Sequence, residues 1–132
     1  MTLQTLGFLF SPSMQEVLLV EKNYRLNGIG GELRGEGETY HEGQVRAFKE
    51  VTGLDIPEWL LFAVIRGHGY REHCYMAMSD SVFRADSTAT APVFLCNLRT
   101  LSCLTEQNAE FLIPLALRSD RMELPTIIQF KS

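Results

Sequence analysis

The stretch from Leu26 to Leu54 constrains the fold of this chain more than any other, because a glycine-rich loop there leads directly into an amphipathic helix. Five glycines fall within ten residues of the loop, which lets the backbone turn tightly and approach other groups closely. The helix is predicted to run from about Glu38 to Thr52, and Gly53 stands where a helix C-cap is expected. The sequence therefore predicts a loop–helix unit around which the rest of the chain is arranged.

This unit resembles the Nudix box, a signature written G-x5-E-x7-R-E-U-x-E-E-x-G-U, in which U is a bulky apolar residue. Gly31 and Glu38 match the first glycine and the first glutamate, and Arg46 follows with the spacing that the signature requires. Further matches in register are Phe48, Glu50, Gly53 and Leu54. The resemblance implies the Nudix fold, an α/β/α sandwich with a mixed β-sheet between helices, formed by residues 1–132 as a single domain.

The chain departs from the signature at the positions that carry its chemistry. Positions 47, 50 and 51 are spaced i, i+3 and i+4, so they lie on one face of a helix. Three carboxylates there would hold a magnesium or manganese ion that bridges to substrate phosphates. This chain has Ala47 and Val51 beside a single Glu50, and its loop is one residue longer than the signature allows. We therefore expect weak or lost hydrolysis.

The resemblance extends beyond the box, from about Gly7 to Leu117. The family's loop commonly reads K-W-N-G-x-G-G, and this chain has the similar run from Arg25 to Gly31. The segment QNAEFLIPLALR, Gln107 to Arg118, is predicted to be a helix and resembles N-L-x-W-L-I-P-x-A-L of one Nudix branch. That branch also carries an acid in a T-D-E-x-V context, and Thr90 to Val93 lack it here.

The resemblance also implies a set of site residues. Arg46 is expected to position Glu38 or Glu50, as the family's arginine does; a solvated charged face of Glu42, Arg46 and Glu50 is the alternative. A metal ion, if one binds, would use Glu50, with Glu36, Glu38 or Glu42 completing the site. The expected catalytic residues are Glu50, Arg46 and Glu38, and the expected ligand-binding residues are Arg25, Asn27, Gly30, Gly31, Arg34 and Asn108.

The remaining elements follow from apolar runs and turn signals. A hairpin is predicted across Ser11-Pro12-Ser13, and EWLLFAVIR, Glu58 to Arg66, is predicted to be a central strand. Residues 81–92 read as a loop, and the apolar tail near Ile127 and Ile128 as an edge strand or an interface. The other predicted strands are Leu6–Phe10, Val17–Glu21, Glu72–Asp80, Val93–Cys96 and Leu124–Phe130.

Charge and composition limit the classes of partner. The net charge of −4 gives no electrostatic footprint for duplex nucleic acid. No run of about 20 apolar residues is present, so no membrane association is expected. The three scattered cysteines are typical of buried thiols in a reducing cytoplasm, and His68, His73 and Cys74 lack a recognised metal-binding spacing.

Three functions remain open on these grounds. The first is a protein that binds a nucleoside diphosphate derivative in the cleft beside the box helix, with weak or lost hydrolysis. The second is an active, metal-dependent pyrophosphohydrolase that uses a rearranged set of acids. The third is a non-catalytic scaffold that forms a homodimer.

Overall fold

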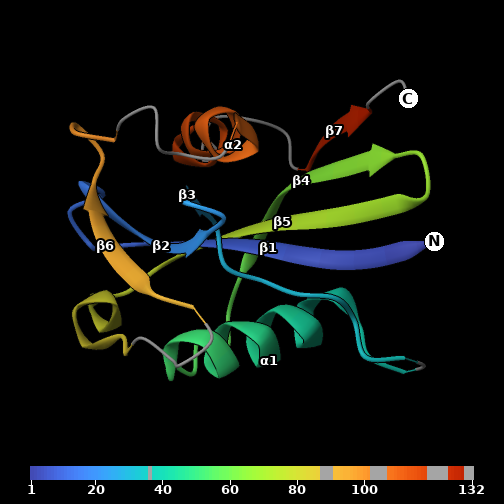
Figure 1. Ribbon diagram of the computed structural model, residues 1–132, viewed down its shortest axis with the longest axis horizontal. Coiled ribbons are helices and arrows are strands. Elements are labelled where there is room, and N and C mark those ends of the chain that lie inside the picture. Colours follow the sequence, from blue (N-terminus) through green and yellow to red (C-terminus); the bar gives the residue numbers. More distant parts are fainter. Residues whose placement is uncertain (36, 87–90, 102–106, 119–124, 130–132) are drawn as a thin grey trace.

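The computed structural model describes residues 1–35, 37–86, 91–101, 107–118 and 125–129. Within these residues a seven-stranded mixed sheet lies between two helices, α1 (Tyr40–Thr52) below it and α2 (Gln107–Leu117) above it in Figure 1. The predicted α/β/α sandwich is confirmed. Among the described residues, no helix is long and apolar enough to cross a membrane.

The sheet is built around two parallel strands that are far apart in the sequence. β1 (Thr2–Phe10) pairs along its whole length with β5 (Tyr70–Met78). The main strand order is β3-β2-β1-β5-β4-β7, and β6 (Val93–Asn97) pairs with β2 off this path. The remaining strands are β2 (Glu16–Lys22), β3 (Arg25–Asn27), β4 (Leu60–Gly67) and β7 (Thr126–Gln129).

Most predicted strands are present, with shifted ends. The hairpin of β1 and β2 is confirmed, and β7 is an edge strand that pairs in parallel with β4. β4 is an interior strand, as its apolar sequence predicts, and it pairs with β5 on one side and β7 on the other. The predicted loop over residues 81–92 includes part of a short 3-10 helix, η1 (Asp80–Arg84). Residues 87–90 of this loop lie outside the described residues, as does Thr105, a residue of a type that often caps helices, which precedes α2.

Helix α1 begins two residues later than predicted, because Thr39 is its N-cap. The Thr39 hydroxyl accepts a hydrogen bond from the Glu42 backbone, and the Glu42 carboxylate accepts one from the Thr39 backbone. This reciprocal pair satisfies two of the free amides at the helix start. The predicted C-cap is confirmed at Gly53, whose φ of 78° is readily adopted by glycine.

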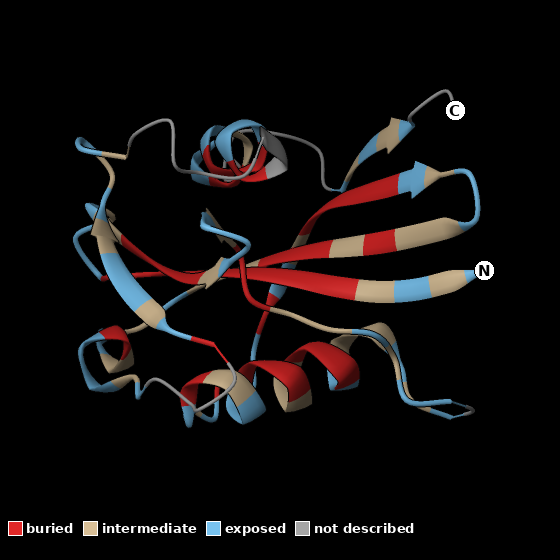
Figure 2. Ribbon diagram, viewed as in Figure 1, coloured by how far each residue is buried: buried red, intermediate tan, exposed pale blue. Residues whose placement is uncertain are grey.

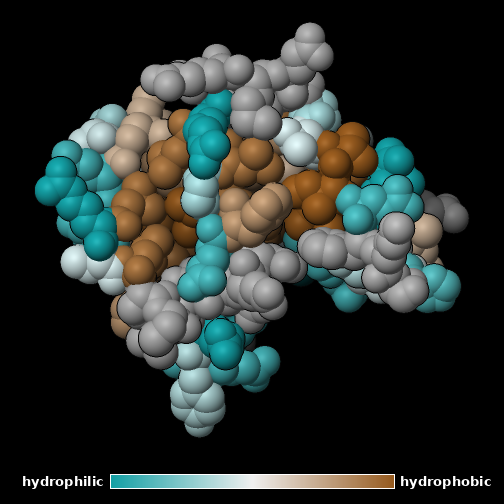
Figure 3. All heavy atoms as spheres, turned by 90° about the horizontal axis from the view of Figure 1, so that it is seen from above, coloured by the Kyte–Doolittle hydropathy of each residue, from teal (hydrophilic) through white to brown (hydrophobic). Residues whose placement is uncertain are grey.

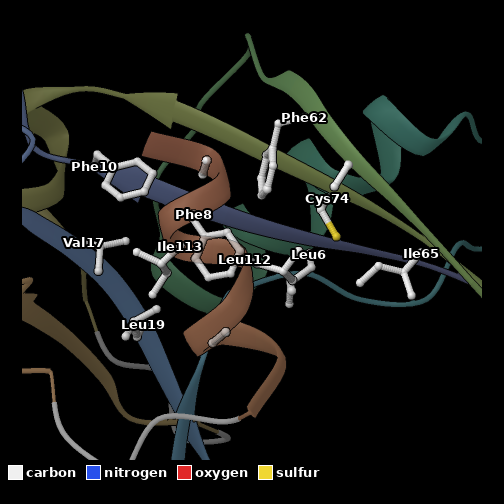
Figure 4. Close-up of a cluster of buried hydrophobic side chains, with 13 residues drawn as sticks. Leu6, Phe8, Phe10, Val17, Leu19, Phe62, Ile65, Cys74, Leu112 and Ile113 are labelled. Carbon is white, nitrogen blue, oxygen red and sulfur yellow. The ribbon is translucent and has the colours of Figure 1, made fainter. Parts of the chain in front are cut away.

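Buried residues follow the strands of the sheet and the side of α1 that faces it (Figure 2), and the hydrophobic ones form two clusters. Under α2, Leu112 and Ile113 pack on Leu6 and Phe8 of β1, in the cluster shown in Figure 4. On the opposite face, Phe48 of α1 packs with a second cluster. Trp59 belongs to that second cluster; its ring meets Phe48 edge to face at 4.9 Å between centroids.

Candidate functional site

The loop before α1 is held against the helix by Arg46. Its Nε donates to Glu38 Oε2 at 2.7 Å and its Nη2 donates to Glu38 Oε1 at 3.0 Å, so the pair is bidentate. The same Nη2 also donates to the backbone carbonyl of Glu32 at 2.9 Å. One guanidinium therefore fixes both ends of the loop that separates the glycines from the helix.

These contacts change the acid–base properties of both partners. Hydrogen bonds from the Arg46 side chain and the Arg34 backbone lower the pKa of Glu38 to about 2. Hydrogen bonding to Glu38 raises the pKa of Arg46. Glu38 is thus an ionised structural acid at neutral pH, with its oxygens already committed to donors within the loop and helix.

A glycine inside the helix makes this packing possible. A Cβ added at Gly43 would overlap the side chain of Leu33 and lie 3.3 Å from Glu38 Oε1. Glycine in a helix interior destabilises by about 1 kcal/mol relative to alanine. Here the missing side chain lets the loop residues lie directly on the helix, which accounts for a glycine that the sequence alone leaves unexplained.

We call the helix face formed by positions 47, 50 and 51 the box face. Its one carboxylate, Glu50, contacts two arginines. Arg34 Nη2 lies 2.6 Å from Glu50 Oε1, and Arg46 Nη1 lies 3.2 Å from Glu50 Oε2. We call Arg34, Glu38, Arg46 and Glu50 the charge cluster. It contains two acids and two arginines, so its formal charges cancel.

The charge cluster does not fit a divalent cation. Magnesium prefers carboxylate and water oxygens in a site of net negative charge. Glu50 faces two guanidinium groups instead, while Ala47 is buried and supplies no ligand. Among the described residues, no group of three or more His, Cys, Asp or Glu side chains is placed to hold a metal ion. Glu42, an expected alternative ligand, is used in the helix cap, and Glu36 lies outside the described residues.

The glycine loop runs along β1, and most of its backbone N–H groups donate hydrogen bonds within the protein. Isolated bridges join Gln4 to Glu32 and Gly7 to Ile29. A Cβ at Gly30 would overlap the carbonyl of Thr5, so glycine is required for this approach. Between residues 28 and 34, the amides that donate to described residues are those of Gly28, Ile29, Gly31, Leu33 and Arg34.

Helix α1, the helix of the box, also holds this loop in place. Gln44 is fully buried, and its Nε2 donates to the carbonyl of Ile29 at 3.0 Å. A Cβ at Gly7 would overlap this Gln44 side chain. The loop is therefore held between β1 and α1 by contacts within the protein.

A cavity of about 300 Å³ opens beside the glycine loop. We call it the loop cavity. Its wall combines loop backbone with polar side chains from β1, β2, β3 and β5; the lining residues are Gln4, Thr5, Leu6, Lys22, Asn27, Gly28, Gly30, Gly31, Glu32 and Glu72. Its size falls at the lower end of the range typical of small-molecule sites.

Glu72 is the buried acid of the loop cavity. It is 7% exposed, and its Oε2 accepts a hydrogen bond from Gln4 Nε2 at 2.5 Å. Burial raises the pKa of Glu72 above its ordinary value. A carboxyl in such a place can accept a hydrogen bond from an N–H group or, when protonated, donate one. The sequence places Glu72 in a strand but gives no signal for this role, because its partner Gln4 is 68 positions away.

The expected ligand-binding residues are only partly brought together. Asn27, Gly30 and Gly31 line the loop cavity. Arg25 is exposed on β3 and does not line it, whereas Lys22 on the paired strand does. Arg34 sits on the same loop but is drawn to Glu50. The Asn108 side chain lies outside the described part of the chain.

No protein-family model matches the chain, and no curated protein matches it in sequence. Solved structures do match it in fold. A mutator MutT protein of Bacillus halodurans is similar with a TM-score of 0.76 and 14% identity, over 99% of this chain and 91% of that one. An ADP-ribose pyrophosphatase of Streptococcus suis has a TM-score of 0.66 and 17% identity, over 98% of both chains.

A third structure, the Nudix domain of Shewanella oneidensis NrtR, was solved in complex with ADP-ribose. Its TM-score is 0.69 at 20% identity, over 88% of this chain and 86% of that one. These similarities show that the chain has the Nudix fold.

Proposed function

We propose that this Nudix-fold protein binds a nucleoside diphosphate derivative in the loop cavity and hydrolyses it weakly or not at all. The observation that carries the proposal is the loop cavity itself. Three of the residues expected to bind ligand line it, together with the buried carboxyl of Glu72.

The chemistry of the wall suits a nucleotide-type ligand. Asn27 is held by its own Oδ1, which accepts from the Gly28 backbone at 2.8 Å, so its amide NH2 group is oriented. Lys22 adds a positive charge at the wall, and Gln4 and Glu72 offer hydrogen-bonding groups on adjacent strands. This mixture of amide, carboxyl and cation matches a ligand that combines a base or sugar with phosphate.

Weak or lost hydrolysis follows from the charge cluster. Hydrolysis of a diphosphate needs a cation to neutralise charge and to generate a nucleophilic water. The alternative of a rearranged acid set would draw on Glu38 and Glu42, and both carboxylates already accept hydrogen bonds that hold the loop or cap the helix. Recruiting either acid to a metal ion would break one of these structures.

ADP-ribose is the probe of choice, because it is the ligand bound to the NrtR Nudix domain. Binding should be measured by calorimetry and by the melting temperature, and turnover by product analysis with magnesium, with manganese and with chelator. The panel should include nucleoside triphosphates, nucleotide sugars and dinucleoside polyphosphates. We expect saturable binding with little turnover; a ligand at 100 times its Kd adds about 2.7 kcal/mol of stability.

The control variant is Glu50→Gln. Metal-dependent turnover that disappears in Glu50→Gln would favour the active pyrophosphohydrolase over our proposal. Absence of binding across the whole panel would rule out the loop cavity as a nucleotide site and leave the scaffold function.

A homodimer is favoured by a separate observation, the apolar side chains exposed around α2. Phe111 is 57% exposed and Ile127 of β7 is 50% exposed. Figure 3, seen from the α2 side, shows apolar surface gathered there. We propose a second copy of the chain as the occupant. Sedimentation equilibrium should give a dimer that Phe111→Ser weakens, and a monomer at all concentrations would exclude the scaffold function.

A further inference from the structure

We propose that Arg34 takes the place of a divalent cation at the box helix, so that it neutralises the phosphates of a bound ligand and binding needs no metal ion. The inference rests on the proposed function, since it concerns how the same ligand is held. The box face has the position of a metal site in the family's pattern, but the residues on it do not fit a metal ion.

The first support is the position of Arg34. Its Nη2 lies 2.6 Å from Glu50 Oε1, the one acid that the box face retains. A guanidinium has five N–H donors in a planar fork. The contact with Glu50 uses one nitrogen, and the described residues offer no other hydrogen-bond acceptor to the Arg34 side chain. The remaining donors are free to meet phosphate oxygens, so Arg34 can bridge a carboxylate and a phosphate as a metal ion does.

The second support is the use of the loop amides. A phosphate at a glycine loop is ordinarily met by backbone N–H groups. Five of the amides between residues 28 and 34 already donate to described protein atoms. Side chains are therefore needed as further donors. Lys22 lines the loop cavity, and Arg34 follows the lining residues Gly31 and Glu32 on the same loop.

The third support is reach and exposure. Arg34 is two residues beyond Glu32, so its backbone lies within about 7 Å of a residue that lines the loop cavity. The Arg34 side chain is 66% exposed and its partner Glu50 is 46% exposed. An exposed ion pair contributes about 0–1 kcal/mol. Turning some N–H donors of Arg34 towards a phosphate therefore costs little free energy.

The decisive experiment measures the Kd of ADP-ribose by calorimetry in excess chelator and again in millimolar magnesium. We expect the two values to agree within about twofold, because no metal bridges the protein and the ligand. We expect Arg34→Gln to weaken binding about tenfold in chelator, through the loss of charge-assisted hydrogen bonds. The matched control is Arg84→Gln, which removes an arginine that is also 66% exposed and ion-paired, to Asp80, but belongs to η1.

Binding that occurs only with magnesium, or an unchanged Kd in Arg34→Gln, would overturn this inference and leave the proposed function standing. Failure of ADP-ribose to bind under either condition would overturn both. The two failures are therefore distinguishable.

A second readout titrates magnesium and manganese into the protein without nucleotide. The native chain should show no saturable binding, whereas the double variant Ala47→Glu/Val51→Glu should gain it, because three carboxylates then share the box face. Saturable binding by the native chain that is lost in Glu50→Gln would contradict the inference.

Discussion

The charge cluster and the loop cavity lie on the same loop and differ in how their polar groups are used. In the charge cluster, both carboxylates face guanidinium groups from the loop or from α1. In the loop cavity, the buried Glu72 accepts a hydrogen bond from Gln4 and forms part of the wall. The first region resembles a Nudix box in sequence, but its acids are paired with arginines of the protein. The second includes Asn27, Gly30 and Gly31 of the family-like loop, but its buried acid, Glu72, belongs to no signature. Here the residues of a catalytic motif hold the loop and the helix together, and the cavity beside them adds groups, such as Glu72, that the motif does not include.

The largest expected effect comes from Gly30→Ala, which would separate the loop from β1. Its Cβ would overlap the Thr5 carbonyl, so the loop must shift and the strand bridge must open, at a cost of about 3 kcal/mol. Urea denaturation measures this cost. Gly35→Ala is the control; its φ of 59° is strained for alanine, but nothing lies within 4 Å, so we expect about 1 kcal/mol. Equal losses in the two variants would show that the loop is not clamped.

Arg46→Ala tests whether the charge cluster holds the loop. It removes the bidentate pair and leaves Glu38, whose side chain is only 15% exposed, without its main donor. We expect a loss of about 2 kcal/mol in the free energy of unfolding, below the cost for fully buried pairs. Arg84→Ala should lose less than about 0.5 kcal/mol. A loss in Arg46→Ala no larger than in this control would reduce the cluster to a solvated charged face.

Acid titration tests the same pairing of Glu38 with Arg46. Because the pKa of Glu38 is lowered from 4.5 to about 2, its contribution to stability is complete above pH 4.5 and is lost as the pH falls towards 2. After allowance for solvent screening we expect about 1–2 kcal/mol. Glu38→Gln should lose that part of the pH dependence. An unchanged slope between pH 4.5 and 2 would contradict the assignment.

The smallest effect is expected at the loop cavity, from Glu72→Gln. Burial raises the pKa of Glu72, so the sign is opposite to that of Glu38. Its protonated form favours folding, and stability falls as the pH rises from 4.5 through the raised pKa. Glu72→Gln should flatten this fall and weaken ADP-ribose binding by about three- to tenfold. Unaltered affinity would place the ligand elsewhere.

The parts of this structure that sequence could predict depend on local signals. The hairpin of β1 and β2 follows from a turn sequence between apolar runs, and the end of α1 follows from Gly53. Arg46 was expected to position Glu38 or Glu50, and it contacts both.

The parts that sequence could not predict depend on pairing between distant segments. β1 and β5 are joined in parallel across 68 positions, and no local pattern specifies that register. The same pairing places Gln4 beside Glu72 and so creates the polar wall of the loop cavity. The contact between Arg34 and Glu50 depends on the course of a loop one residue longer than the Nudix signature, which no spacing rule describes.

The most direct test of this account is an amide chemical-shift map of the isotope-labelled protein during titration with ADP-ribose in chelator. The account predicts saturable shifts concentrated at Gln4, Asn27 to Arg34 and Glu72, with little change at Arg84. Shifts that cluster on another face of the molecule, or that appear only after magnesium is added, would contradict it.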